Sequence, residues 1–291
     1  MFAIVTDTAA NLESSWLQSH QVKTIPFVYS VDGVEKSCAN LADFDPRTYY
    51  EAIRNGSRVK TSQITPQQYL DCMEPLLDAG QDVLFVGMSS GISGSFASAQ
   101  MAVKMMRCPE RQIRLVDTLG ASLGEGLLVM EAARLREEGR SLDETACALE
   151  GMRQSMCQVF TVEDLMHLRL TGRLSSVKAL VGTVLKIKPL LKGDATGRIV
   201  NFANVRGRKQ AIMAMAKRYD ELVARPEEQT VGIAHADCPE DAQMLETLLR
   251  ANHPPREILT VPYEPMTGSH VGPGALALFF LGEENARSKL V

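Results

Sequence analysis

Short runs of apolar residues alternate along the chain with longer segments in which apolar residues recur every three or four positions. Five of these runs have the length of a buried strand: residues 2–5, 83–86, 113–116, 231–234 and 258–261. Strands that alternate with helical segments in this way are typical of an α/β fold. We therefore expect an α/β protein whose sheets are covered by helices.

Helical spacing is clearest after Thr65 and Pro66, which together are typical of a helix start. Tyr69, Met73 and Leu77 then recur on one helix face. A hairpin is predicted with residues 193–197 as its turn. Two further helices have a recognisable end: one over 128–135 that ends near Gly139, and one over 161–167 with Thr161 as its cap. Other helices are predicted after Asp7 or Thr8, over 177–184, 212–222 and 241–249, and from Gly274 onward.

Length and organisation favour two domains. The 291 residues exceed the commonest size of a single domain. The character of the pattern changes near residues 150–160, and the sequence contains no internal repeat and no low-complexity segment. We therefore expect two α/β domains, one over residues 1–157 and one over residues 158–291.

Composition argues against several classes of protein. A formal net charge of −4 without a block of like charges does not favour nucleic acid as a partner. The first residues lack the pattern of a signal peptide, and the apolar run 275–281 is too short to span a bilayer, so we expect a cytoplasmic protein. Six scattered cysteines without CxxC spacing indicate reduced thiols rather than disulfides or zinc ligands.

Three polar turns stand next to predicted strands and helices. We name them the first polar turn (residues 60–63), the second polar turn (residues 88–95) and the third polar turn (residues 268–274). Ligands of open α/β sheets bind beyond the carboxyl ends of the strands. The start of a helix has free N–H groups and the positive end of the helix dipole, which suit an anion. Together the turns predict a site for a small anion.

The candidate ligands in these turns are the hydroxyls of Thr61 and Ser93 and the imidazole of His270. Each has a simpler interpretation, because serine and threonine before helices are usually caps and a single histidine is usually structural. A hydrolase triad of Ser93, His270 and an aspartate is an alternative. It lacks the last glycine of the G-x-S-x-G motif, because Ser95 occupies that position.

Nucleotide and metal sites are not indicated. The chain contains neither GxxxxGK[ST] nor GxGxxG. His235, Asp237 and Cys238 are close in sequence but have no second pair of metal ligands, and they are interpreted as a strand end and a helix cap. No cofactor and no metal ion are therefore expected.

Seven stretches carry a more specific pattern: Ile4-Val5-Thr6-Asp7-Thr8, Thr61-Ser62-Gln63, Ser89-Ser90-Gly91-Ile92-Ser93-Gly94-Ser95, Thr171-Gly172-Arg173-Leu174-Ser175, Lys186-Ile187-Lys188-Pro189, Arg206-Gly207-Arg208-Lys209 and His270-Val271-Gly272-Pro273-Gly274-Ala275. In this order, over residues 2 to about 282, they resemble the DegV family, which includes the fatty-acid-binding subunits of bacterial fatty acid kinase. The chain departs from the family pattern at Asn11, at Thr171, and at Ile64, where a proline is usual.

The resemblance implies a fatty acid in a tunnel between two α/β domains. Thr61 and Ser93 would hold its carboxylate, with Ser62, Gly94 and His270 as further contacts. Burial of an acyl chain contributes roughly 0.8 kcal/mol per methylene, so about 15 methylenes contribute on the order of 10 kcal/mol. A hydrogen bond to a charged group contributes only about 1.5–3 kcal/mol. The acyl chain would therefore give affinity, and the turns would fix the orientation.

The resemblance also implies a carrier without catalytic residues, which presents the long-chain fatty acid to a separate kinase catalytic subunit. That subunit would form acyl-phosphate for phospholipid metabolism in a bacterium. Arg173 is the candidate contact to it, with a surface arginine as the simpler interpretation. Lipid exchange would involve peripheral contact with a membrane. The alternatives are a lipid sensor, a phosphotransferase related to dihydroxyacetone kinase, and the lipid hydrolase that would use Ser93 and His270.

Overall fold

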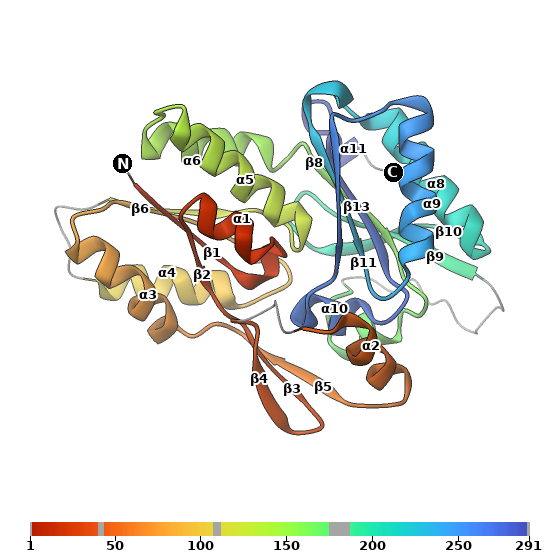
Figure 1. The fold of residues 1–291 in the computed structure, drawn as a ribbon, viewed down its shortest axis with the longest axis horizontal. Coiled ribbons are helices and arrows are strands. Elements are labelled where there is room, and N and C mark those ends of the chain that lie inside the picture. The colour runs from red at the N-terminus through yellow and green to blue at the C-terminus, as the bar shows by residue number, and fades with distance from the viewer. Residues whose placement is uncertain (1, 40–43, 107–111, 175–186, 290–291) are drawn as a thin grey trace. The chain divides into compact units, whose positions relative to one another are not determined.

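A computed structural model describes residues 2–39, 44–106, 112–174 and 187–289 of the chain. The chain folds into two compact units (Figure 1). Unit 1 consists of Met1–Phe44 and Arg58–Arg153, and unit 2 of Asp45–Ser57 and Gln154–Val291. Residues 45–57 therefore interrupt unit 1 in sequence but belong to unit 2. Contiguous domains that divide at residue 157 remain a prediction.

Unit 1 is built on a four-stranded parallel sheet with the order β2-β1-β6-β7. The four strands are β1 (Ala3–Asp7), β2 (Val22–Ile25), β6 (Val83–Gly87) and β7 (Ile113–Asp117). Strands β1 and β6 are buried along their whole length. This explains why both are nearly continuous apolar runs, since a central parallel strand is covered on both faces.

Helices cover both faces of this sheet. Helices α3 (Pro66–Asp78) and α4 (Ser95–Met105) lie on one side, and α5 (Leu123–Glu137) and α6 (Leu142–Met152) on the other (Figure 1). A short 3-10 helix η1 (Thr8–Ala10) and α1 (Ser14–Ser19) follow β1. The helix start predicted at Thr65 is confirmed, because Thr65 and Gln68 form a reciprocal capping box.

A second, antiparallel sheet belongs to unit 1 and has the order β4-β3-β5. Its strands are β3 (Val28–Val31), β4 (Val34–Ser37) and β5 (Val59–Ser62). Asp32 and Gly33 connect β3 to β4, and both have positive φ angles. Asp-Gly with this backbone conformation forms the tight turn that suits the twist of a hairpin. The apolar pattern of the sequence does not predict these strands, although the Asp-Gly pair indicates the hairpin.

Unit 2 contains a six-stranded mixed sheet with the order β10-β9-β8-β13-β11-β12. The strands are β8 (Met156–Thr161), β9 (Ile187–Gly193), β10 (Ile199–Arg206), β11 (Thr230–His235), β12 (Glu257–Pro262) and β13 (Leu276–Leu281). The hairpin predicted around residues 193–197 is confirmed by the antiparallel pairing of β9 with β10. Helices α8 (Arg208–Leu222) and α9 (Pro239–Asn252) pack on the sheet, with Met215, Tyr219 and Leu245 in the core.

Two predictions in unit 2 are wrong. Thr161 does not cap a helix, because it is the last residue of β8 and pairs with Leu276. Gly274 does not start a helix, because residues 276–281 form strand β13 between β8 and β11. The run Ala275 to Leu281 is continuously apolar, and periodicity alone does not distinguish a buried strand of this kind from a buried helix.

The remaining elements of unit 2 are short. They are α2 (Pro46–Arg54), α7 (Met166–Leu170), η3 (Pro226–Glu228), α10 (Pro265–Val271) and α11 (Ala286–Lys289). The helix predicted over 177–184 lies outside the described residues. Within the described ranges, no helix is both long enough and apolar enough to cross a bilayer.

Candidate anion-binding site

The first and second polar turns meet in unit 1 at the start of α4. The main-chain N–H of Ile64, directly after the first turn, donates to the Oγ of Ser95 at 3.1 Å. The Ser93 hydroxyl donates to the same oxygen at 3.0 Å. Two turns that are far apart in sequence are therefore joined through one buried serine.

Close packing between these turns explains the glycine at position 94. A Cβ atom at Gly94 would lie 2.1 Å from the Oε1 of Gln63. Without a side chain there, the Gln63 amide lies across the start of α4, and its Nε2 donates to the Oγ of Ser98 at 3.3 Å. The resemblance to the DegV family implies Gly94 as a site residue but assigns no role to Gln63, although Gln63 follows Thr61 and Ser62 in the matching stretch.

Ser93 directly precedes Gly94, which is the N-cap residue of α4, and this helix has no side-chain cap hydrogen bond, so the simpler interpretation of Ser93 as the helix cap is wrong. The Ser93 Oγ accepts a hydrogen bond from the main-chain N–H of Ser95 at 3.2 Å. This position next to the start of α4 places the hydroxyl near the positive end of the helix dipole, where an anion is stabilised. The φ angle of Ser93 is not in the left-handed region, and the whole second polar turn separates β6 from α4. This differs from the sharp, strained turn of a hydrolase nucleophile.

Thr61 and Ser62 lie in strand β5 rather than in a loop between a strand and a helix. Thr61 is half-buried and pairs with Tyr29 of β3, and Ser62 is the exposed last residue of β5. Helix α3 begins four positions later, at Pro66. The first polar turn is thus the end of an antiparallel strand, and Ile64 is the residue that connects it to α4.

The second polar turn is held from both sides by aspartates that end neighbouring strands. The Oδ2 of Asp7, at the end of β1, accepts the main-chain N–H of Met88 at 3.1 Å. The Oδ1 of Asp117, at the end of β7, accepts the N–H of Ser90 at 3.2 Å. From the sequence, Asp7 is predicted only as a helix cap. No local pattern indicates a bond between residues this far apart in sequence.

Asp7 is buried, and burial raises the pKa of its carboxyl from 3.8 to about 6. Hydrogen bonds from the N–H groups of Met88 and Ala9 oppose this rise, as does a side-chain hydrogen bond with Glu125 of α5. Glu125 is itself fully buried and accepts a hydrogen bond from the Thr6 hydroxyl at 3.0 Å. A hydrogen bond between two carboxyl groups requires a proton on one of them.

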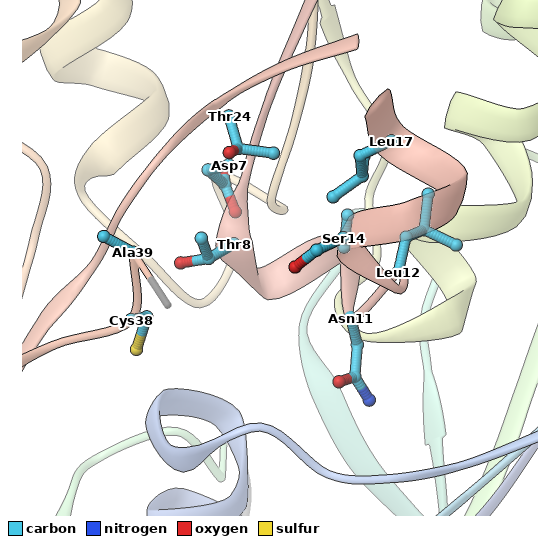
Figure 2. Close-up of a pocket in the computed structure, with 10 residues that line it drawn as sticks. Asp7, Thr8, Asn11, Leu12, Ser14, Leu17, Thr24, Cys38 and Ala39 are labelled. Atoms are coloured by element: carbon cyan, nitrogen blue, oxygen red, sulfur yellow. The ribbon is translucent and has the colours of Figure 1, made fainter. Parts of the chain in front are cut away.

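A small pocket opens beside the end of β1 (Figure 2). The pocket has room for about one water molecule and is too small for an acyl chain. Asn11, a departure from the family pattern, lines this pocket, and its Nδ2 donates to the Ser122 hydroxyl at 3.1 Å. The lining residues are Asp7, Thr8, Ala10, Asn11, Leu12, Ser14, Leu17, Thr24, Cys38 and Ala39.

His270 and Arg173 both belong to unit 2, and the charge of Arg173 contributes to the pKa of the His270 imidazole. His270 lies in the last turn of α10 rather than in a loop before a helix. Burial lowers its pKa to about 4, and the positive charge of Arg173 acts in the same direction. His270 is therefore neutral at pH 7 and lies close enough to a guanidinium to respond to its charge. A neutral imidazole beside a guanidinium suits an anionic ligand.

Helix α10 is anchored within unit 2 by α2. The Tyr49 hydroxyl donates to the carbonyl of Pro265 at 2.7 Å, and the Tyr50 hydroxyl to that of Tyr263 at 2.8 Å. A Cβ atom at Gly268 would lie 1.9 Å from the Tyr50 oxygen, so glycine permits this close approach. The segment that interrupts unit 1 in sequence thus fixes the helix of His270.

No group of three or more histidine, cysteine, aspartate or glutamate side chains among the described residues is arranged to hold a metal ion. The candidate site in unit 1 consists of hydroxyls, main-chain N–H groups and buried carboxyls. The pair in unit 2 consists of an imidazole and a guanidinium.

Comparison with known proteins places this geometry in a family. A model described as "Uncharacterised protein, DegV family" matches residues 1–283. The chain belongs to the DegV family. A DegV domain-containing protein of Clostridium perfringens is 34% identical over 284 residues, which cover 97% of this chain and 98% of that protein.

Two solved DegV structures resemble the fold closely. One reports fatty acid binding of a DegV-family protein from Thermus thermophilus, with a TM-score of 0.88 and 26% identity, and covers 97% of this chain and 99% of that one. The other is DegV of Bacillus subtilis, described as a fatty acid binding protein, with a TM-score of 0.84 and 29% identity over 97% and 99% of the two chains. The predicted family and the α/β fold with mixed sheets are confirmed.

Proposed function

We propose that this DegV-family chain binds a single long-chain fatty acid, with its carboxylate at the first and second polar turns and its acyl chain in an apolar tunnel. The main support is the hydrogen-bonded connection of Ile64, Ser95 and Ser93, which brings the Thr61 and Ser93 segments together at the start of α4. Solved relatives described as fatty-acid-binding proteins support the ligand class.

The neutral His270 beside Arg173 supports an anionic ligand independently of unit 1. We propose His270 as a further contact of the carboxylate and Arg173 as a contact of a separate kinase catalytic subunit. The chain then performs no chemistry alone. It presents the bound acid in the cytoplasm for acyl-phosphate formation, and it exchanges lipid through transient contact with a membrane surface.

The test is mass spectrometry of the purified protein under native conditions, followed by titration with palmitate and by ATPase and esterase assays. We expect one fatty acid per chain and no turnover of ATP or of an acyl ester. Turnover of an ester that Ser93→Ala abolishes would contradict the carrier and favour the hydrolase. Turnover of ATP by the chain alone would favour a phosphotransferase.

A further inference from the structure

We propose that Asp7 and Asp117 are positioning residues, which hold the second polar turn in the conformation that binds the ligand's carboxylate. The inference rests on the proposed function. By holding the main chain of the turn, these two side chains determine how strongly the protein prefers an acid over a neutral ligand.

The sheet order places both aspartates beside the turn. Strand β6, which leads into the second polar turn, lies between β1 and β7. Asp7 and Asp117 are the last residues of these two neighbours. Their carboxyl oxygens accept the main-chain N–H groups of Met88 and Ser90, as described above. The beginning of the turn is thus fixed from both sides.

Backbone hydrogen bonds extend this anchoring to Ser93. The N–H of Ser89, between the two anchored residues, donates to the carbonyl of Gly120 at 2.8 Å. The carbonyl of Ser89 in turn accepts the N–H of Ser93 at 3.1 Å. A shift of Met88 or Ser90 would therefore move the serine whose hydroxyl and neighbouring N–H groups are proposed to bind the acid.

The two aspartates use their oxygens differently. Asp7 uses one oxygen for Ala9 and the other for Met88, so an asparagine, which has a single acceptor oxygen, keeps only one of these bonds. Asp117 uses Oδ1 for both Ser90 and Leu119, so an asparagine can keep both bonds. Asp7→Asn and Asp117→Asn are therefore the same chemical change, but only Asp7→Asn is expected to remove a hydrogen bond.

The groups around Asp7 indicate that its buried carboxyl has a functional role rather than a stabilising one. Glu125 of α5 is hydrogen-bonded to it. Burial raises the pKa of the Tyr69 phenol in α3, and the charges of Asp7 and Glu125 raise that pKa further. No cationic side chain is among the groups that act on the pKa of Asp7 within the described structure. A buried carboxylate without a cation is unfavourable for stability, and such groups are found preferentially at functional sites.

Asp82 offers a matched control. Its Oδ1 accepts the main-chain N–H of Gln112 at 2.9 Å, which is the same kind of bond between neighbouring strands. Asp82 precedes β6, however, so this bond lies at the opposite end of the sheet from the second polar turn. A general loss of sheet stability would appear in an Asp82 variant, whereas a loss of turn position would not.

The experiment measures the affinities of palmitate and hexadecanol for the wild type, Asp7→Asn, Asp117→Ala, Asp117→Asn and Asp82→Ala, together with hydrogen exchange of the Met88 and Ser90 amides. We expect Asp7→Asn and Asp117→Ala to reduce the preference for acid over alcohol by about fivefold or more. The anchored amide should exchange faster in each. Asp117→Asn and Asp82→Ala should keep the wild-type preference.

The contrary results are distinct. Unchanged preference in Asp7→Asn and Asp117→Ala, with the wild type still preferring the acid, would overturn the positioning role alone. An equal loss in Asp82→Ala would also overturn it. A wild type that binds neither ligand would remove the proposed function and this inference with it. If Asp7→Asn does not fold, the contrast between Asp117→Ala and Asp117→Asn decides the question.

Discussion

The main-chain N–H of Ile64 donates a hydrogen bond to the Ser95 hydroxyl at 3.1 Å, and this bond joins two polar turns of unit 1. Ser95 is buried and also accepts the hydroxyl of Ser93. The end of β5, which contains Thr61, is therefore fixed to the start of α4. A site assembled in this way depends on the close approach of the two turns.

Gly94→Ala tests that approach. The new Cβ would meet the Gln63 amide, which must swing away and lose its hydrogen bond to Ser98. We expect palmitate affinity to fall several-fold, with little change in unfolding free energy because Gln63 is exposed and flexible. Isothermal titration and urea unfolding measure the two effects.

Gly151→Ala is the matched control for this variant. Gly151 lies in helix α6, and a Cβ there would meet nothing within 4 Å. This change should leave palmitate affinity unaltered and raise stability by about 0.5–1 kcal/mol, since alanine favours the helix over glycine. Equal palmitate affinity in both variants would contradict a role for the contact between Gln63 and Gly94.

Asp7 predicts a specific pH dependence of stability. Its pKa is raised from 3.8 in the unfolded chain to about 6 in the folded one. Between these values the folded protein retains a proton that the unfolded chain has released, so stability falls as pH rises through this window. The difference corresponds to roughly 3 kcal/mol at about 1.4 kcal/mol for each pKa unit.

Urea unfolding of the wild type and Asp7→Asn at several pH values between 4 and 7 measures this effect. The wild type should lose stability relative to the variant as pH rises, and the difference should level off above pH 6. Parallel stability curves for the two proteins would show that Asp7 titrates alike in the folded and unfolded chains.

Arg173→Ala should raise the pKa of His270. Burial is the larger cause of the low pKa of about 4, and this cause would remain in the variant. The positive charge of Arg173, which disfavours the protonated imidazole, would be removed. The pKa should therefore move up towards 6.5 without reaching it. An NMR titration of the His270 ring measures the midpoint.

Arg169→Ala provides the comparison for this titration. Arg169 is an exposed arginine of α7 in the same stretch of chain, and it is not among the charges that act on the pKa of His270. The midpoint of His270 should stay at its wild-type value in this variant. Equal midpoints in all three proteins would mean that Arg173 does not lie beside His270.

Local patterns were sufficient for the elements that follow simple rules. The buried strands β1 and β6 are apolar runs, and α3 has a capping box and a one-sided apolar face. The same rules failed for β13, because a continuously apolar segment has no period to distinguish a strand from a helix. The exposed strand β4 has no apolar pattern at all.

In the candidate site, too, some residues can be recognised from the local sequence and others cannot. Thr61, Ser93 and Gly94 stand in recognisable polar turns, and their positions next to strands and helices favour an anion site on the sequence alone. The roles of Ser95 and Asp7 depend on contacts with residues distant in sequence, such as Ile64 and Met88. A single sequence shows local patterns only and contains no signal for contacts between residues this far apart.

The most direct test is a titration of palmitate and hexadecanol against the wild type, Thr61→Val, Ser93→Ala and the double variant, with Ser141→Ala as a control. The Ser141 hydroxyl accepts the N–H of Glu144 at the start of α6, and the Ser93 hydroxyl accepts the N–H of Ser95 at the start of α4, so this control separates the loss of a hydrogen bond at a helix start from the loss of a ligand contact. Each site hydroxyl should contribute about 1–3 kcal/mol, or roughly five- to 150-fold in palmitate affinity. The double variant should lose more, though less than the sum, because both hydroxyls bind one carboxylate. Hexadecanol should bind more weakly than palmitate to the wild type, and this difference should shrink in the double variant while Ser141→Ala keeps it. Equal palmitate affinity in all of the folded proteins would show that the carboxylate is not bound by Thr61 and Ser93.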